Sequence, residues 1–387
     1  MLSLLPLDIL TFELLPRLDY SSKLILRHVL LSTPLPSSLS PDIQREICQY
    51  PVSYLSIFSS LINPFQFCDY LAFHGNLPGL KWARSLSLPW SYSTSSIASS
   101  QGHLHIVQWA YFNGCPWNES TCTSASQFGN LDILVWAIHH GCPFYDNVCC
   151  TAALYGHLHI LIWAHSNGHL LTSSTASNAA SSGHLSILHW LHEHSFPFDV
   201  ETFSSAAGFG NLSILQFLLS IFCPYDEWSM AYACSSGHIH ILEWLKSHSF
   251  PSSPLSSHYA AEGNHLLVLQ WLKSHHYPFD SLTTAAAAKY GHLDLLVWLR
   301  SISCPWDEST CVSAAINGHL DVIKWAHQNG CPWNVLTCSA AATGGHLSLL
   351  KWLRSQNCPW DSNTTYNSAW TGNLELRRWA ISNGCPV

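Results

Sequence analysis

Cysteine and histidine, the side chains most often used as zinc ligands, are abundant in this chain. The 387 residues include 15 cysteines and 25 histidines, side chains that can ligate zinc. Pairs such as Cys115 and Cys122 lie seven residues apart, whereas zinc sites normally draw one pair of ligands from positions about two to four residues apart. No C-x-x-C motif occurs, and Cys149 stands directly beside Cys150, which is poor geometry for one tetrahedral ion. We therefore expect no metal site and no cofactor.

The candidate nucleophiles are repeated along the chain. Serines, cysteines and histidines recur at one fixed interval, whereas a catalytic constellation is unique within a chain. No G-x-S-x-G, P-loop or dinucleotide-binding motif is present. The chain is therefore predicted to have no catalytic residues, and the repeated side chains are predicted to serve a scaffold.

The fixed interval is 27 residues, and a glycine marks it. Twelve such anchor positions follow one another without insertion or deletion, and eleven of them are glycine. Each anchor is followed by His or Asn, and a large aromatic residue stands seven residues after it. A proline stands fourteen residues after every anchor but one. The anchors are Gly75, Gly102, Gly129, Gly156, Gly183, Gly210, Gly237, Asn264, Gly291, Gly318, Gly345 and Gly372.

Each 27-residue unit is predicted to contain two helices. Residues 104–110 place apolar side chains at helical spacing, which predicts the second helix of a unit. That helix is predicted to end at Asn113-Gly114, because glycine adopts the left-handed conformation of a C-cap. The proline that follows prevents the helix from continuing. Asp307, Asn334 and Asp361 then stand where the N-cap of the next helix is expected.

The units are predicted to stack on one another. Paired alanines such as Ala314-Ala315 allow neighbouring helices to approach closely, and the tryptophans are expected to fill the space between units. No unit can bury its own apolar stripe, so stability must come from its neighbours. The sequence therefore predicts an all-α helical-repeat solenoid of about twelve two-helix units behind an N-terminal helical module.

One unit resembles an ankyrin repeat. Gly318-His319-Leu320 through Trp325, with Ala314-Ala315 before it and Gly330 after it, matches the spacing of the second ankyrin helix. The period is 27 residues instead of about 33, the T-P-L-H element is absent, and Cys-Pro-Trp replaces Ala-Asp-Val. The resemblance covers residues 66–387. It implies a divergent ankyrin-like array with little or no strand, and a function in binding another protein.

The N-terminal segment resembles an F-box. Leu5-Pro6-Leu7-Asp8-Ile9-Leu10 and then Leu14-Leu15 follow the first half of that motif. The resemblance implies that residues 1–65 dock onto the adaptor subunit of a cullin-RING ubiquitin ligase, while the repeats of 66–387 hold the substrate. The alternative is a helical cap that shields the apolar face of the first repeat. The residues expected to dock are Leu5, Pro6, Ile9, Leu10, Leu14 and Leu15.

The positions just before each anchor vary between units, and several of them are aromatic. Presented from successive units along one edge, such side chains would serve as anchors for a protein partner. The alternative is that they are loop residues that tolerate change and pack locally. The candidate partner-binding residues are Phe128, Tyr155, Phe209, Tyr290 and Trp370.

The amino-acid composition bears on disorder, on the kinds of partner and on the location of the protein. Only 10% of the residues are charged and 48% are hydrophobic, which is too apolar for a disordered chain. No uninterrupted apolar run is long enough for a membrane span, so we expect no membrane partner. The net charge is −8 and the few lysines and arginines form no cluster along the sequence, so we expect no nucleic-acid partner. The odd number of cysteines favours a reducing, intracellular location, which is the cytoplasm or, as the alternative, the nucleus, and the protein is expected to be a monomer.

Overall fold

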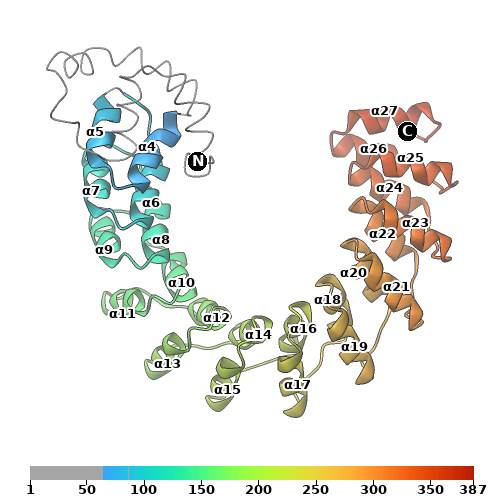
Figure 1. The fold of residues 1–387 in the computed structure, drawn as a ribbon, viewed down its shortest axis with the longest axis horizontal. Helices are drawn as coiled ribbons and strands as arrows, with labels where there is room; N and C mark the ends of the chain where they lie inside the picture. Colours follow the sequence, from blue (N-terminus) through green and yellow to red (C-terminus); the bar gives the residue numbers. More distant parts are fainter. Residues whose placement is uncertain (1–63, 86) are drawn as a thin grey trace, which may run out of the picture. The chain divides into compact units, whose positions relative to one another are not determined.

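The computed structural model describes residues 64–85 and 87–387, and every regular element in those residues is an α-helix. The helices form consecutive pairs, one pair to each 27-residue unit, which confirms the predicted all-α helical-repeat solenoid (Figure 1). The first helices of the pairs are α4 (Pro64–Phe73), α6 (Tyr92–Ser100), α8 (Glu119–Gln127), α10 (Asp146–Leu154), α12 (Ser173–Ser181), α14 (Val200–Gly208), α16 (Trp228–Ser235), α18 (Ser256–Glu262), α20 (Ser281–Lys289), α22 (Glu308–Ile316), α24 (Val335–Thr343) and α26 (Ser362–Trp370). The second helices are α5 (Leu77–Ser85), α7 (Leu104–Phe112), α9 (Leu131–His139), α11 (Leu158–Ser166), α13 (Leu185–Glu193), α15 (Leu212–Ser220), α17 (Ile239–Ser247), α19 (Leu266–Ser274), α21 (Leu293–Ser301), α23 (Leu320–Gln328), α25 (Leu347–Ser355) and α27 (Leu374–Ser382).

The predicted N-terminal module lies outside the described residues, and so do its docking residues Leu5, Pro6, Ile9, Leu10, Leu14 and Leu15. The expected boundary between residues 65 and 66 falls inside α4. The division into a module of 1–65 and a solenoid of 66–387 therefore stays a prediction.

The chain divides into two compact units. The first extends to Ala179 and includes Ser186–Phe196, and the second comprises Ala180–Leu185 and Pro197–Val387. Each unit is built from the same helix pairs, so the local geometry is described once for both.

The predicted helix caps are present. The Asp307 side chain accepts a hydrogen bond from the backbone N–H of Ser309 at 2.9 Å, and Asn334 accepts from Leu336 at 2.9 Å. Asp361 caps α26 in the same way. Gly114 and Gly330 adopt φ values of 76° and 82° after their second helices, the left-handed conformation that glycine tolerates best. Other repeats place a non-glycine residue there, for example Phe222 at φ 58°.

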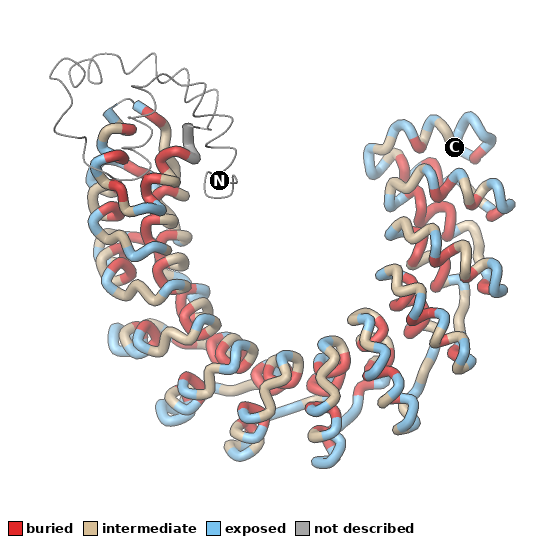
Figure 2. The backbone as a smooth tube through the Cα atoms, viewed as in Figure 1, coloured by how far each residue is buried: buried red, intermediate tan, exposed pale blue. Residues whose placement is uncertain are grey.

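First helices pack directly on first helices within each unit, whereas second helices pack mainly on their own first helix. The small residues explain this arrangement: α22 buries Thr310, Cys311 and the predicted pair Ala314-Ala315 on its contact faces. Figure 2 shows buried backbone running through successive first helices and exposed backbone on the far sides of the second helices.

Each second helix buries one narrow apolar stripe. In α23 the stripe is Val322, Ile323 and Ala326, and the same three positions are buried in α7 through α25. The repeated tryptophan is only half-buried: Trp325 packs edge-on against Trp306 with ring centroids 5.9 Å apart. The indoles thus fill the wider gaps between second helices, as expected, but leave part of each ring at the surface.

Candidate functional site

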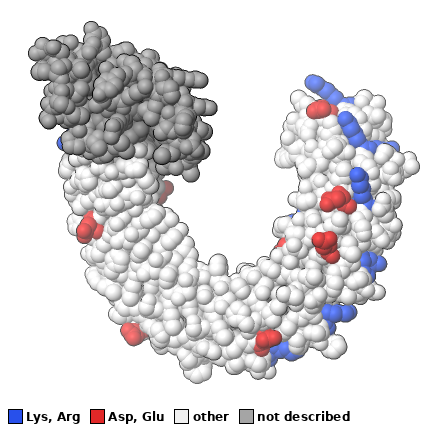
Figure 3. Space-filling model, in the orientation of Figure 1, with Lys and Arg blue, Asp and Glu red and all other residues white. Residues whose placement is uncertain are grey.

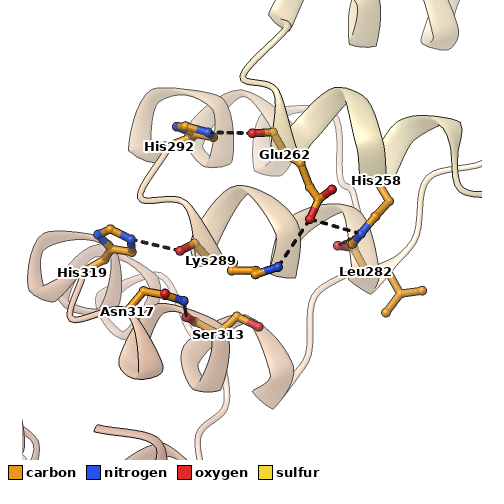
Figure 4. A network of polar contacts seen from close by, with 8 residues as sticks. All are labelled: His258, Glu262, Leu282, Lys289, His292, Ser313, Asn317 and His319. Carbon is orange, nitrogen blue, oxygen red and sulfur yellow. Dashed lines mark hydrogen bonds and ion pairs between the residues drawn. The ribbon is translucent and has the colours of Figure 1, made fainter. Parts of the chain in front are cut away.

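The histidine after each anchor belongs to the scaffold. In six repeats its Nε2 lies within hydrogen-bonding distance of a backbone carbonyl thirty residues earlier, in the preceding repeat. His319 meets the carbonyl of Lys289 at 3.0 Å and His292 meets that of Glu262 at 3.1 Å (Figure 4). These contacts form a ladder of bonds between successive anchor turns.

Asparagine replaces histidine in the same ladder. The Nδ2 of Asn130 donates to the carbonyl of Ser99 at 2.7 Å, and Asn211 donates to Ala180 at 2.8 Å. The alternation of His and Asn after the anchor therefore follows from a shared donor position. Within residues 64–85 and 87–387, no group of three or more His, Cys, Asp or Glu side chains is placed to hold a metal ion.

The repeated cysteine before the proline also contacts backbone. Cys331 donates from its Sγ to the carbonyl of Asp307, the N-cap residue of its own repeat, at 3.4 Å, and Cys142 donates to Asn118 at 3.3 Å. Burial raises the pKa of the Cys304 thiol to about 12, and it raises that of Cys149 to about 12 as well. The thiols of Cys304 and Cys149 therefore stay protonated at neutral pH and are poor nucleophiles.

The five predicted partner-binding residues are all exposed, each at the end of a first helix. In the first unit Tyr155 contacts the neighbour of Phe128 in sequence, because Gln127 Nε2 donates to Tyr155 Oη at 3.0 Å. The structure does not bring Phe209, Tyr290 and Trp370 together, because repeats without an aromatic residue at this position stand between them. The exposed fractions are Phe128 51%, Tyr155 47%, Phe209 66%, Tyr290 46% and Trp370 82%.

Polar contacts hold Tyr290 in place. The Lys289 ammonium lies 4.8 Å from the centre of the Tyr290 ring and 3.5 Å from a carboxylate oxygen of Glu262. Hydrogen bonding to Tyr290 is the main cause that raises the pKa of Lys289 above its ordinary value. Figure 4 shows Glu262 between Lys289 and His258, which lies 3.8 Å away on the same helix.

An aromatic patch next to Phe209 was not predicted. Trp228 and Tyr232 lie four residues apart on α16 with ring centroids at 6.3 Å, and Tyr259 on α18 lies 5.9 Å from Trp228. A Cβ built on Gly208 would lie 3.1 Å from that of Tyr232, so the end of α14 adjoins the same surface. We define the aromatic patch as Phe209, Trp228, Tyr232 and Tyr259. Its sequence signal is the i, i+4 pair Trp228 and Tyr232, with Tyr259 one 27-residue repeat after Tyr232.

A row of basic residues was also missed. We define the basic edge as seven side chains on the second helices α17 to α27: Lys246, Lys273, Arg300, Lys324, Lys351, Arg354 and Arg378. Figure 3 shows lysine and arginine side chains gathered along this side of the second unit. The prediction that these residues form no cluster is wrong, because residues 27 apart in sequence become neighbours when the repeats stack.

No helix in the described ranges 64–85 and 87–387 is both long enough and apolar enough to cross a bilayer.

The ankyrin repeats (many copies) family matches residues 311–354. This match and the helical repeats together support an ankyrin-like repeat protein. No curated protein matches the chain.

Several solved structures are similar in their helical-repeat architecture. The pentatricopeptide repeat protein PPR10 in complex with an 18-nt psaJ RNA element is 11% identical, at a TM-score of 0.36 over 89% of this chain. A cysteine-to-serine variant of that complex gives the same values. The same protein from maize is 12% identical, at a TM-score of 0.34 over 90% of this chain. In all three comparisons the chain spans 64% of the other protein.

The prediction that nucleic acid is excluded as a partner is corrected. Its premise of dispersed positive charge fails at the basic edge. With TM-scores below 0.4, the similar structures do not assign a ligand to this chain.

Proposed function

We propose that this ankyrin-like repeat chain is a non-catalytic scaffold that binds another protein through the aromatic patch. The observation that carries the proposal is the exposure of Phe209 (66%), Tyr232 (44%) and Trp228 (38%) on adjoining first helices. Exposed aromatic side chains that lie together are the residues most often found at the energetic centre of a protein interface.

The aromatic patch joins rings of neighbouring first helices. Other first helices also expose large apolar side chains, such as Tyr366 and Trp370 on α26. On α16 and α18 the rings of Trp228, Tyr232 and Tyr259 lie close together across two repeats. Tyrosine and tryptophan provide a large contact area and lose little side-chain entropy on binding.

A non-catalytic role agrees with the chemistry of the repeated side chains. The histidines after the anchors bond backbone carbonyls, and the buried thiols of Cys304 and Cys149 stay protonated. The helical-repeat fold is typical of binding scaffolds. A reducing, intracellular compartment is part of the proposal, and the free cysteines of the described chain support it.

The F-box-like segment supports a second, narrower proposal. If residues 1–65 dock onto the adaptor of a cullin-RING ubiquitin ligase, the protein held by the repeats is the substrate. The sequence match at Leu5-Pro6 through Leu14-Leu15 is the support for this role. The alternative, a cap for the first repeat, leaves the scaffold without a ligase.

The proposal is tested by partner capture with the full-length chain. Proteins retained from a eukaryotic lysate by the wild-type chain are compared by mass spectrometry with those retained by a Trp228→Ser/Tyr232→Ser variant. Tyr92→Ser is the matched control, because Tyr92 is 54% exposed on α6 in the first unit. We expect one or more proteins to be lost with the patch variant and kept with the control.

A partner found in this way is then purified and its affinity measured directly by calorimetry. We expect the patch variant to weaken binding by about thirtyfold or more, which corresponds to a loss of about 2 kcal/mol. If every retained protein binds wild type and variant equally, the patch is not the binding site. Cullin-ligase subunits among the retained proteins would support the adaptor role, and their absence would favour the cap.

A further inference from the structure

The basic edge follows the period of the repeats. Lys246, Lys273 and Arg300 occupy one position of successive second helices, and Arg354 occupies it two repeats later. Lys324, Lys351 and Arg378 occupy a second position, one helical turn earlier. Every second helix from α17 to α27 contributes at least one cation. Directly packed helices lie about 8–10 Å apart, and these second helices are spaced more widely, so the row extends over more than about 40–50 Å.

The basic edge is confined to one part of the array. The second helices α7, α9, α11, α13 and α15 contain no lysine or arginine. In the described ranges, the other cations are Lys81, Arg84, Lys289 and Arg377. Lys81 and Arg84 occupy the same two repeat positions on α5, and five second helices without a lysine or arginine separate them from α17. A general need for solubility would distribute cations over all repeats, so this concentration calls for a local reason.

The helix dipole explains only part of the row. Lys246, Lys273, Arg300 and Arg354 stand in the last turns of their helices, where a cation is favoured by the partial negative charge of the helix end. Lys324 and Lys351 stand one turn earlier, where that effect has fallen away. The two rows together therefore indicate an external anion.

The positive charges of the edge are not neutralised by ion pairs. The ion pairs found in residues 64–85 and 87–387 join Glu262 to Lys289 and to His258, away from the basic edge. On α21, α23 and α27 the acidic residues Asp294, Asp321 and Glu375 stand in the first turn, at the opposite end of each helix.

Other acidic side chains belong to the same repeats as the basic edge. Asp280, Asp307 and Asp361 each accept a hydrogen bond from the backbone N–H at the start of their own first helix. Hydrogen bonds from serine hydroxyls hold the pKa of Asp307 below its ordinary value, so it stays an ionised cap. Glu243 on α17 is the acidic residue on the same helix as Lys246, and no contact joins the two side chains.

The cations alternate with indole rings. Lys246 lies 5.7 Å from the ring centre of Trp271, and Lys324 lies 5.9 Å from that of Trp352, in each case the tryptophan of the next repeat. Arg300 stacks 4.1 Å over Trp306. These tryptophans are half-buried, so part of each ring faces solvent beside a cation.

We propose that the basic edge binds the phosphate backbone of a single-stranded nucleic acid. A row of cations at a constant interval matches a polyanion whose charges are also evenly spaced, and half-exposed indoles between the cations offer stacking surfaces to unpaired bases. An acidic polypeptide has carboxylates but no rings to stack, and a duplex keeps its bases paired. This surface is separate from the aromatic patch and does not depend on the proposed protein partner.

The test measures the affinity of the full-length chain for a fluorescein-labelled oligothymidylate of about 20 nucleotides by fluorescence anisotropy, between about 50 and 200 mM NaCl. Each phosphate neutralised on a single strand contributes a slope of about −0.7 to log K against log salt concentration. Seven cations therefore allow a slope as steep as about −5. We expect binding with a slope at least as steep as about −3, because the four lysines substituted below would together contribute about −2.8.

Single substitutions locate the site. Lys246→Gln, Lys273→Gln, Lys324→Gln and Lys351→Gln are each expected to reduce the slope by about 0.7, and the fourfold variant to lose at least about tenfold in affinity at the lowest salt concentration. Lys289→Gln and Lys81→Gln remove the same charge elsewhere and are expected to leave the slope unchanged. Circular dichroism confirms that each variant is folded.

Several results would overturn the proposal. One is the absence of binding at about 50 mM NaCl, and another is an equal loss with the control lysines. Tighter binding of a duplex of the same length would reject the single strand. Displacement of the oligonucleotide by polyglutamate at equal charge concentration would show that the edge selects an acidic polypeptide instead. Trp228→Ser/Tyr232→Ser should bind the oligonucleotide like wild type, so the two proposals fail independently.

Discussion

At the scale of single residues, the helix caps and turns could be predicted from the sequence because each depends on local backbone geometry. Asp307, Asn334 and Asp361 accept the N-terminal hydrogen bonds that their place after the proline predicts. For the repeated histidines the sequence predicts only a role in the scaffold, since the partner of His319, the Lys289 carbonyl, belongs to the preceding repeat. Sequence spacing alone does not reveal which repeat supplies that partner.

Phe222 is predicted to be a strained position. It holds φ 58° where other repeats place glycine, and its side chain is 91% exposed, so it gains little from burial. A left-handed conformation costs an L-residue about 1–2 kcal/mol, partly offset by the greater entropy of unfolded glycine. We expect Phe222→Gly to raise the free energy of unfolding by up to about 1 kcal/mol in urea titrations. Gly330→Ala is the converse control and should lower it; a lower urea midpoint for Phe222→Gly would contradict this account.

At the scale of elements, the ladder between anchor turns is predicted to contribute to repeat stacking. His319→Ala removes the side chain that meets the Lys289 carbonyl and is expected to lower the free energy of unfolding by about 1 kcal/mol. His319→Asn should retain most of that stability, because Asn130 and Asn211 make the same bond in their repeats. Urea titration of both variants distinguishes a ladder bond from simple packing, for which alanine and asparagine would lose equally.

One rung of the ladder is predicted to make stability depend on pH. Burial, followed by the neighbouring His240, lowers the pKa of His238 below the ordinary histidine value of about 6.5. The unfolded chain therefore binds a proton more readily than the folded chain, so this stability is present above about pH 6.5 and is lost as the pH falls through the folded pKa. We expect the unfolding midpoint of His238→Asn to fall less than that of wild type between about pH 7.5 and 5.5. An equal fall in both chains would show that other histidines carry the dependence.

At the scale of the whole chain, the 27-residue period was sufficient to predict the helix pairs, because every unit repeats the same anchor, tryptophan and proline. The surfaces could not be predicted in the same way. Lys246, Lys273 and Arg300 look dispersed along the sequence, and only stacking of the repeats aligns them. Trp228 and Tyr232 do not stand just before an anchor, and only the packing of α14 on α16 places Gly208 next to Tyr232.

These observations separate two kinds of position. Residues that recur in most repeats bond or pack against neighbouring backbone, as His319 and Cys331 do. Residues that differ between repeats, such as Tyr232 and Lys246, form the exposed surfaces. We infer that the varied residues bind a partner and that the repeated residues stabilise the fold.

This inference is tested with the Trp228→Ser/Tyr232→Ser chain. Calorimetry measures its affinity for the captured protein partner, and urea titration of the same preparation gives its unfolding midpoint. We expect a loss of affinity of about thirtyfold or more with little change in the midpoint. Unchanged affinity would contradict the inference, and so would a loss of affinity that only follows a loss of folded structure.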